Sequence, residues 1–407
     1  MMATSRRNLT ILTFVLFVVM LGYGIVIPIL PFYIEHMGAG GLELGLLVAS
    51  YAVMRLIFGP IWGGLSDRYG RKPVLLLGIF GYVVTMLWFG LATRLWMLFA
   101  ARILSGVLSS ATAPTTMAYI GDSTTEEGRG GGMGMLGAAA GIGTIIGPAA
   151  GGFLASASLA TPFFVAAGMA LLSFVLAWLF LPESHPLESR EQAAKASLID
   201  LPLWRQALFS PIGPLFALIF ISTSGLMIFG NVFGLYALRK FSYGPDEVGI
   251  ILMVLGLVSA LTQGLLAGPA TRRWGDEAIL KAFLLVAAVA YGLMLLADSF
   301  PTVILTTAFF AMAVSLQTPS LLSLTSRRAT VPQGIAMGLS NSFTSLGRIF
   351  GPILGGYLLD VHLGLPYLAG TVIIAAGFVV SLFVIRKPIE RSRMSASELQ
   401  SAEKQIP

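Results

Sequence analysis

The sequence predicts an all-α membrane protein with twelve transmembrane helices in two pseudo-symmetric six-helix bundles. Hydrophobic residues make up 56% of its 407 residues, and charged residues only 11%. The apolar residues form twelve runs long enough for helices that cross a bilayer core about 30 Å thick, without the alternation typical of transmembrane strands. The stretch 141–154, GIGTIIGPAAGGFL, returns in similar form at 345–358, SLGRIFGPILGGYL, which indicates a duplicated chain.

Residues 1–181 are expected to form the first bundle. Arg6 and Arg7 precede an apolar run, as in a twin-arginine export signal, but this run is too long for a cleavable signal core and leads into further spans. We therefore interpret it as the first membrane helix. The six spans of this bundle are expected at residues 9–34, 41–65, 73–92, 95–120, 131–155 and 161–181.

Residues 182–211 are expected to form a cytoplasmic linker between the bundles. Its first half is polar, whereas Leu198, Leu201, Trp204 and Leu208 recur at near-helical spacing in its second half. This spacing predicts a short helix on the inner membrane surface, and a disordered connector is the alternative.

Residues 212–386 are expected to form the second bundle. The charged residues 387–407 then form a mobile cytoplasmic tail. The six spans of this bundle are expected at residues 212–237, 247–268, 278–297, 303–325, 334–359 and 366–385.

Lysine and arginine are distributed unevenly between the two sets of loops. One set holds only Arg94, Arg239 and Lys240, and three more arginines lie within spans, which leaves 19 of the 25 basic residues in the other loops and the tails. Because cytoplasmic loops are enriched in basic residues, we expect a cell inner (cytoplasmic) membrane protein, multi-pass, with both termini cytoplasmic. This topology explains the net charge of +6 without a nucleic-acid partner.

Several classes of site have no sequence signal. The chain contains no cysteine, and its three histidines are scattered, so no metal site is expected. The glycine-rich run 128–134 lacks the Lys-Ser/Thr ending of a phosphate-binding loop. We therefore expect no cofactor and no catalytic site, and we do not expect an enzyme.

Two glycine motifs mark the fifth and eleventh spans. Glycines four residues apart form a stripe without side chains on one face of a helix, where another helix can approach closely in lipid. The proline after the middle glycine removes a backbone donor and favours a bend. We expect these stripes to be a moving contact between the two halves. The motifs comprise Gly143, Gly147, Pro148, Gly151 and Gly152 in one span, and Gly347, Gly351, Pro352, Gly355 and Gly356 in the other.

The loop between the second and third spans carries the pattern G-x-x-x-D-R-x-G-R-K. Gly63 is expected to let the second span approach a neighbour, and Gly70 to allow a tight turn. Asp67 can accept hydrogen bonds from arginines or from a helix N-terminus. We expect these residues to hold two helices together on the inner side and to release them, and we name the group the inner-loop latch. Its members are Gly63, Asp67, Arg68, Gly70, Arg71 and Lys72.

The corresponding loop of the second half reverses the charges of the latch. When Gly275 is aligned with Gly70, Asp67 becomes Arg272, and Arg71 and Lys72 become acidic, as Asp276 and Glu277. We expect this second loop to be weaker or differently connected.

Three arginines, Arg55, Arg102 and Arg348, lie near the middle of spans. A charge at the bilayer centre costs at least about 2.5–3.5 kcal/mol, so each should face a cavity or a partner. They either pair with backbone carbonyls or give a cavity a positive lining that favours anionic or zwitterionic substrates. Other mid-span residues suggest a cavity for a bulky amphipathic ligand, namely Tyr23, Phe229, Asn231, Gln263, Gln317 and Asn341.

Together these motifs resemble the major facilitator superfamily. The latch looks like the inner-loop signature of that family, the glycine motifs look like the signature of its drug:proton antiporter branch, and Arg102 with Gly106 looks like its R-x-x-x-G motif. The first span, with Gly22-Tyr23-Gly24 followed by Pro28-Ile29-Leu30-Pro31, is similar to that of bacterial quinolone and tetracycline efflux pumps. The resemblance implies a monomeric secondary transporter that exports hydrophobic or amphipathic small molecules in exchange for protons, by rocking of two halves about a central site. It also implies that Arg102 assists proton movement.

The acidic residues do not fit a proton antiporter simply, because none lies in the central third of an expected span. Val19, Gly230 and Ser315 occupy the approximate positions of the family's buried carboxylates. The proton then either uses a helix end, at Asp122, Glu35 or Asp360, or is not transported. We favour Asp122, because it ends the helix that bears Arg102.

Two other functions stay open. The first is an exporter or facilitator of a specific anionic or zwitterionic metabolite without proton coupling. The second is a membrane receptor or scaffold.

Overall fold

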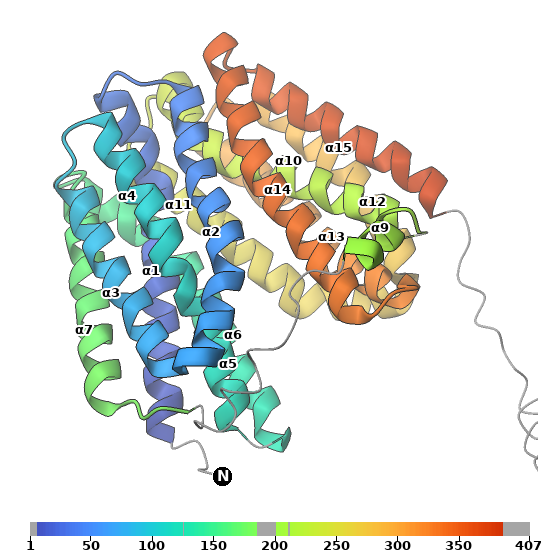
Figure 1. Ribbon diagram of the computed structural model, residues 1–407. Helices are drawn as coiled ribbons and strands as arrows, with labels where there is room; N and C mark the ends of the chain where they lie inside the picture. Colours follow the sequence, from blue (N-terminus) through green and yellow to red (C-terminus); the bar gives the residue numbers. More distant parts are fainter. Residues whose placement is uncertain (1–5, 125, 185–200, 211, 386–407) are drawn as a thin grey trace, which may run out of the picture.

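The computed structural model describes residues 6–124, 126–184, 201–210 and 212–385. Within them the chain is helical and contains no strand. The first half contains seven helical segments and one short 3-10 turn, η1 (Ser109–Ala111), which joins α4 to α5 in one span (Figure 1). These segments are α1 (Arg6–His36), α2 (Gly41–Tyr69), α3 (Arg71–Gly90), α4 (Leu95–Leu108), α5 (Thr112–Ser123), α6 (Glu126–Ala155) and α7 (Thr161–Phe180).

The second half begins after the short helix α9 (Leu201–Leu208). The chain breaks its helical path at Gly275, where φ is +80°, so two spans meet inside α12. A π-helical turn, η2 (Thr262–Leu266), precedes α12, and a 3-10 turn, η3 (Met294–Leu296), follows it. The long helices are α10 (Gly213–Phe241), α11 (Pro245–Leu261), α12 (Ala267–Leu293), α13 (Phe300–Arg328), α14 (Gln333–Val361) and α15 (Leu365–Val384).

The described helices account for twelve spans. Ten segments are long and apolar enough to cross a membrane, and one of them, Pro245–Leu296, contains two spans divided at Gly275. The twelfth is α14, whose many glycine and hydroxyl residues lower its hydropathy. Several helices run past the expected bounds, because the connections between them are short and the backbone stays helical outside the hydrocarbon core.

The short helix expected in the linker is present as α9. It packs against α10 and α14, and Ala207 is fully buried there. The helix begins at Leu201, so Leu198 lies outside the described residues, as does the tail 387–407.

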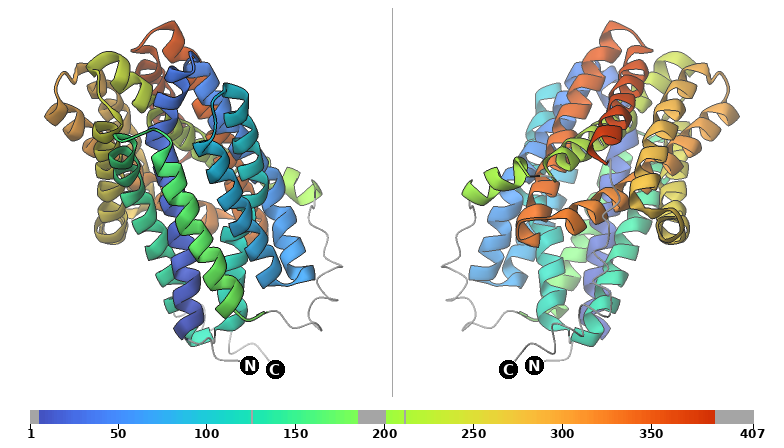
Figure 2. Two further views of the ribbon diagram at one scale, coloured as in Figure 1. Left: turned by 90° about the vertical axis from the view of Figure 1, so that its left-hand side faces the viewer. Right: turned by 90° about the vertical axis from the view of Figure 1, so that its right-hand side faces the viewer.

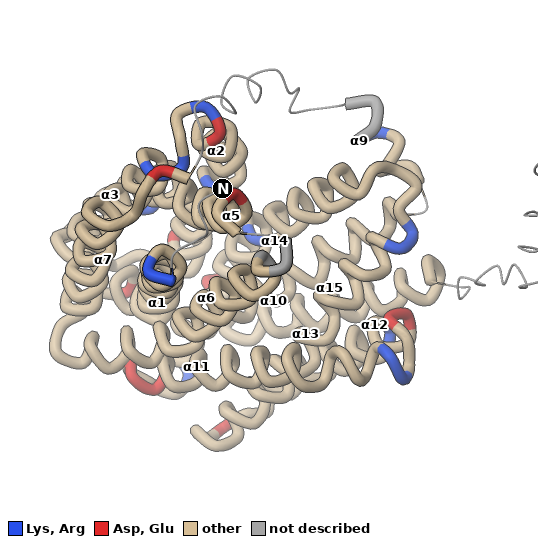
Figure 3. The backbone as a smooth tube through the Cα atoms, turned by 90° about the horizontal axis from the view of Figure 1, so that it is seen from below, with Lys and Arg blue, Asp and Glu red and all other residues tan. Residues whose placement is uncertain are grey.

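The two halves repeat the same packing. In the first half α1 packs against α6, and in the second half α10 packs against α14. Figure 2 shows the two groups of helices from either side. We call the side on which α1 begins and α2 turns into α3 the Arg71 side, and the opposite side the Asp360 side. Figure 3 views the backbone from the Arg71 side, with basic residues at the start of α1 and after α2.

Candidate functional site

The glycine stripes pack inside each half, so the expectation that they lie between the halves is wrong. A Cβ at Gly147 would overlap the backbone of Leu21 and Gly24 in α1, within the first half. A Cβ at Gly351 would lie 2.7 Å from the carbonyl oxygen of Ser224 in α10, within the second half. The lack of side chains does permit close approach of helices, as predicted, but each stripe contacts a helix of its own half.

The contact between the halves uses the next residues of the same motifs. A Cβ at Gly356 of α14 would overlap the backbone of Gly41 in α2. The pseudo-symmetric contact joins α6 to α11, where a Cβ at Gly249 would lie 2.5 Å from the carbonyl oxygen of Pro148. Gly152 of α6 likewise meets the backbone of Pro245. These contacts involve the first turns of α2 and α11, so they close the halves on the Asp360 side.

The same pairs of helices do not meet toward the Arg71 side. A Cβ added at Gly63 would meet nothing within 4 Å beyond its own stretch of helix, so the described residues include no close neighbour of the second span there. The halves are therefore closed on the Asp360 side and parted on the Arg71 side. The same open surroundings are found at Gly59 of α2, Gly130 and Gly134 of α6, Gly264 and Gly268 near the start of α12, and Gly334 and Gly338 of α14.

A charged cluster joins the halves on the Asp360 side. The backbone amides of Gly41 and Leu42, at the start of α2, each donate a 2.7 Å hydrogen bond to the Asp360 carboxylate. Arg239 of α10 donates to Glu35 of α1 at 2.9 Å and lies 3.5 Å from Asp360. The first amides of a helix have no partner within it, and its dipole favours an anion there. We name these five residues the Asp360 cluster.

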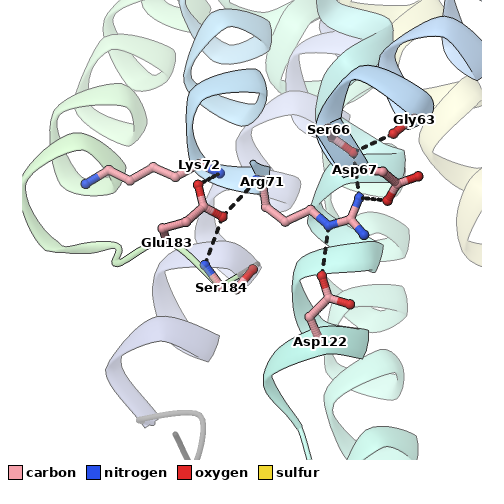
Figure 4. A network of polar contacts seen from close by, with 8 residues as sticks. All are labelled: Gly63, Ser66, Asp67, Arg71, Lys72, Asp122, Glu183 and Ser184. Atoms are coloured by element: carbon pink, nitrogen blue, oxygen red, sulfur yellow. Dashed lines mark hydrogen bonds and ion pairs between the residues drawn. The ribbon is translucent and has the colours of Figure 1, made fainter. Parts of the chain in front are cut away.

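The inner-loop latch connects elements of the first half alone (Figure 4). Gly70 has a φ of +106°, which confirms the tight turn. Arg71 is buried and pairs with Asp67 at 2.5 Å and with Asp122 of α5 at 2.8 Å. The amide of Arg71 donates to Glu183, which follows α7 and was not anticipated. The described contacts of the latch thus tie α2, α3, α5 and the end of α7 together, all within the first half.

The second half contains the same type of pair with its charges reversed. Asp276 accepts a hydrogen bond from Ser323 at 2.7 Å and lies 3.4 Å from Arg327, at the end of α13. Glu277 pairs with Arg328 at 2.5 Å. The start of the third span in each half therefore pairs with the end of the fourth, and the two halves use opposite charges for this pair.

A cavity of about 300 Å³ lies among the central parts of both halves. It collects all three mid-span arginines, and none of the described residues that line it is Asp or Glu. Four elements of the first half supply most of the lining, and α10 and α14 supply one residue each. The lining residues are Val19, Met20, Tyr23, Val26, Tyr51, Arg55, Tyr82, Met86, Arg102, Ser105, Ser109, Thr144, Met227 and Arg348.

Arg102 is the most buried of the three arginines, with 3% of its surface exposed. Its guanidinium carbon lies 4.8 Å from the centroid of the Tyr51 ring, in a cation–π arrangement. Its Nε and the hydroxyl of Tyr82 are both buried without a hydrogen-bond partner. Gly22 makes room for that hydroxyl, because a Cβ there would overlap it.

Tyr23 and Arg55 are among the residues that line this cavity, but five other residues expected in a substrate cavity are not. Phe229 is 1% exposed and stacks on Phe310 inside the second half. Gln317 is fully buried and donates to the carbonyl of Phe283.

The remaining three residues are partly buried or exposed. Asn231 donates to the carbonyl of Met227, one turn earlier on α10. Gln263 and Asn341 are exposed, outside the lining of this cavity.

The structure does not bring Arg102 and Asp122 together. Twenty residues of nearly continuous helix separate them, which corresponds to about 30 Å. Sequence reasoning also missed Tyr51 and Tyr82, which face Arg102. Their one sequence signal is spacing, since Tyr51 precedes Arg55 by one helical turn.

Comparisons with known proteins support one family. The family model of the Major Facilitator Superfamily matches residues 12–244 and 215–405. The chain is 34% identical to Multidrug resistance protein 2 of Bacillus subtilis over 365 residues, or 88% of this chain and 90% of that protein. It is 27% identical to Quinolone resistance protein NorA of Staphylococcus aureus over 378 residues, or 93% and 96%.

Solved structures with low sequence identity share the fold. A bacterial homolog of the human lysosomal transporter Spinster, in an inward-facing and occupied conformation, superimposes with a TM-score of 0.78 at 14% identity, covering 95% of this chain and 98% of that chain. The human organic anion transporter MFSD10 (TETRAN) gives a TM-score of 0.66 at 21% identity, covering 92% and 99%.

Proposed function

Because the chain belongs to the major facilitator superfamily, we propose that it exports hydrophobic or amphipathic small molecules, in the manner of a multidrug efflux pump. The observation that carries this proposal is the cavity lined by both halves, since residues of α14 and α10 meet those of α1–α4 around it. The names of the relatives from Bacillus subtilis and Staphylococcus aureus support the same class of substrate. By the distribution of basic residues, we assign the Arg71 side to the cytoplasm.

The glycines of α2 and α14 support transport by rocking of the halves. Gly41 and Gly45 of α2 meet α14 on the closed Asp360 side. Gly59 and Gly63 lie 18 residues further on, which is five helical turns, and so occupy the same face of α2. On α14, Gly338 lies 18 residues before Gly356 and is equally open. A second close contact of the same kind can therefore form on the Arg71 side when the first one opens.

Proton exchange is the second part of the proposal. The described cavity holds no carboxylate, and Asp122 is bound to Arg71 at the far end of its helix. The carboxylates that join the two halves are Glu35 and Asp360. Protonation of these groups would weaken their bonds to Arg239 and to the start of α2, so acid on the outer side would favour opening to that side.

Uptake of a quinolone into inverted proteoliposomes under an imposed pH gradient tests this function. We expect accumulation that a proton carrier abolishes. The Asp360→Asn variant should reduce the dependence on pH, whereas Asp298→Asn, in a loop on the same side, should not. Accumulation without any response to the gradient would contradict proton exchange and would favour a facilitator, the alternative that the carboxylate-free cavity supports.

A further inference from the structure

We infer that the central cavity binds the acidic group of an amphipathic organic anion, such as a carboxylate or a sulfonate. This inference rests on the proposed export function and names its substrate class. Three guanidinium groups face one cavity from three helices, Arg55 on α2, Arg102 on α4 and Arg348 on α14. None of them forms an ion pair with a described carboxylate, so the cavity carries net positive charge.

The polar atoms around Arg102 are arranged to receive an acceptor. The buried Nε of Arg102 has no hydrogen-bond partner in the described structure, nor has the buried hydroxyl of Tyr82. An unpartnered guanidinium donor away from water is costly, and a ligand that accepts from it removes that cost. A carboxylate or sulfonate offers only acceptors, whereas a protonated amine offers only donors and a quaternary ammonium group offers neither. The unpartnered guanidinium donor of Arg102 thus favours an anion over a cation, and the Tyr82 hydroxyl can donate to the same anion.

The remaining lining suits the apolar part of such a molecule. Met20, Met86 and Met227 are polarizable and adaptable side chains, and Val19 and Val26 complete an apolar wall. The volume of about 300 Å³ is at the lower end of ligand pockets. The ligand therefore presents a compact hydrophobic body beside one acidic group.

The position of the arginines also relates anion binding to movement. Arg348 belongs to the second half, and Arg55 and Arg102 belong to the first. Without an anion these like charges oppose approach of the halves around the cavity. An anion between them reverses that interaction and favours closure of the Arg71 side over the bound molecule.

Binding of two matched probes to the full chain in nanodiscs tests the inference. The probes are 2-naphthalenesulfonate and trimethyl(2-naphthyl)ammonium, which share a ring system and differ in charge. We expect the sulfonate to bind at least about tenfold more tightly, and Arg55→Gln and Arg348→Gln each to weaken its binding about tenfold without weakening that of the ammonium. Arg55 is partly exposed and Arg348 is exposed, so we expect both variants to fold. Arg102 is buried, so Arg102→Gln is less suitable as a test.

The control variant is Arg94→Gln, which removes one positive charge from a loop on the Asp360 side and should change neither affinity. Equal or tighter binding of the ammonium, or an equal loss of both probes in Arg348→Gln, would overturn the inference, as would binding of neither probe. Transport separates this result from the proposed function. A protein that exports the ammonium but not the sulfonate is an exporter with a different substrate class, whereas one that binds the sulfonate and moves neither probe is not an exporter of these molecules.

Discussion

At the scale of single residues, the residue that starts the third span of each half is charged, and the sign of its charge is opposite in the two halves. Arg71 and Asp276 both follow a glycine with positive φ, and each starts the third span of its half. Arg71 pairs with Asp122 at the end of the fourth span, and Asp276 lies near Arg327 at the equivalent end. Either span can therefore carry the basic member of the pair, while the pairing itself holds the two helix ends together.

This symmetry predicts that reversal of the first pair is tolerated. The Arg71→Glu variant places like charges beside Asp122 and Asp67, and we expect it to lower the free energy of unfolding by about 1–3 kcal/mol. Adding Asp122→Arg should restore part of that loss, because the reversed pair then matches the arrangement of Asp276 and Arg327. A double-mutant cycle of thermal unfolding measures the coupling. Additive losses in the double variant would show that the pair does not act as a unit.

At the scale of helices, α14 presents different residues to different partners along its length. Gly347 and Gly351 face α10, with which the second half folds, whereas Gly356 faces α2 of the other half. Gly338 lies on the same face as Gly356, five turns earlier, and meets nothing in this conformation. In the proposed movement, α14 thus keeps its contact with α10 and changes its contact with α2.

A large side chain at Gly338 should therefore block movement without harming the fold. We expect Gly338→Leu to leave thermal stability unchanged within about 0.5 kcal/mol, but to keep the Arg71 side open and abolish export. Gly351→Leu is the comparison, since a side chain there overlaps α10 and should destabilise the second half. Ala49 is 4% exposed on α2, about two turns beyond Gly41. The chain has no native cysteine, so maleimide labelling of Ala49→Cys is expected to report opening of the Asp360 side. Unchanged labelling and export in Gly338→Leu would contradict the changing contact.

We expect the Asp360 cluster to determine how firmly the Asp360 side closes. Burial lowers the pKa of Arg239, but its bonds to Glu35 and Asp360 raise that pKa by more, so the net direction is upward. This arginine, beyond the expected span 212–237, stays charged at all relevant pH values. Loss of the negative charge of Glu35 or Asp360 would remove its ion pair with Arg239, so we expect it to weaken the closed side.

At the scale of the whole molecule, the two proposals together fix how export responds to membrane potential. One monovalent anion leaving in exchange for one proton entering moves two positive charges inward, which an inside-negative potential favours by about 4.6 kcal/mol per 100 mV. One monovalent cation leaving for one proton moves no net charge. The sign of the substrate therefore has a measurable electrical consequence.

Export of 2-naphthalenesulfonate should accelerate when valinomycin and a potassium gradient impose an inside-negative potential on oriented proteoliposomes. The rate should also rise with acid outside, because proton entry contributes one of the two charges. A rate that responds to potential alone would indicate a facilitator for anions. An export rate that does not change with the potential would contradict movement of net charge. It would then also contradict the combination of an anionic substrate and proton exchange.

The sequence alone was sufficient for the spans, the duplication and the turns. Runs of apolar residues must be about as long as the bilayer is thick, and Gly70 and Gly275 occupy backbone conformations that other residues avoid. The family followed from motifs that lie close together in the chain. The short helix at 201–208 followed from its spacing, since a helix at a surface is amphipathic.

Only the tertiary structure decided which face of each helix meets which partner. A membrane helix is apolar on its lipid face and on its protein face, so hydrophobic periodicity does not orient it. Phe229 and Trp178 illustrate this, because both lie in apolar helices, and the first is 1% exposed and the second 58%. For the same reason the partners of the glycine stripes, the place of Tyr51 and Tyr82 around Arg102, and the meeting of Glu35, Arg239 and Asp360 depend on how the helices are rotated and packed.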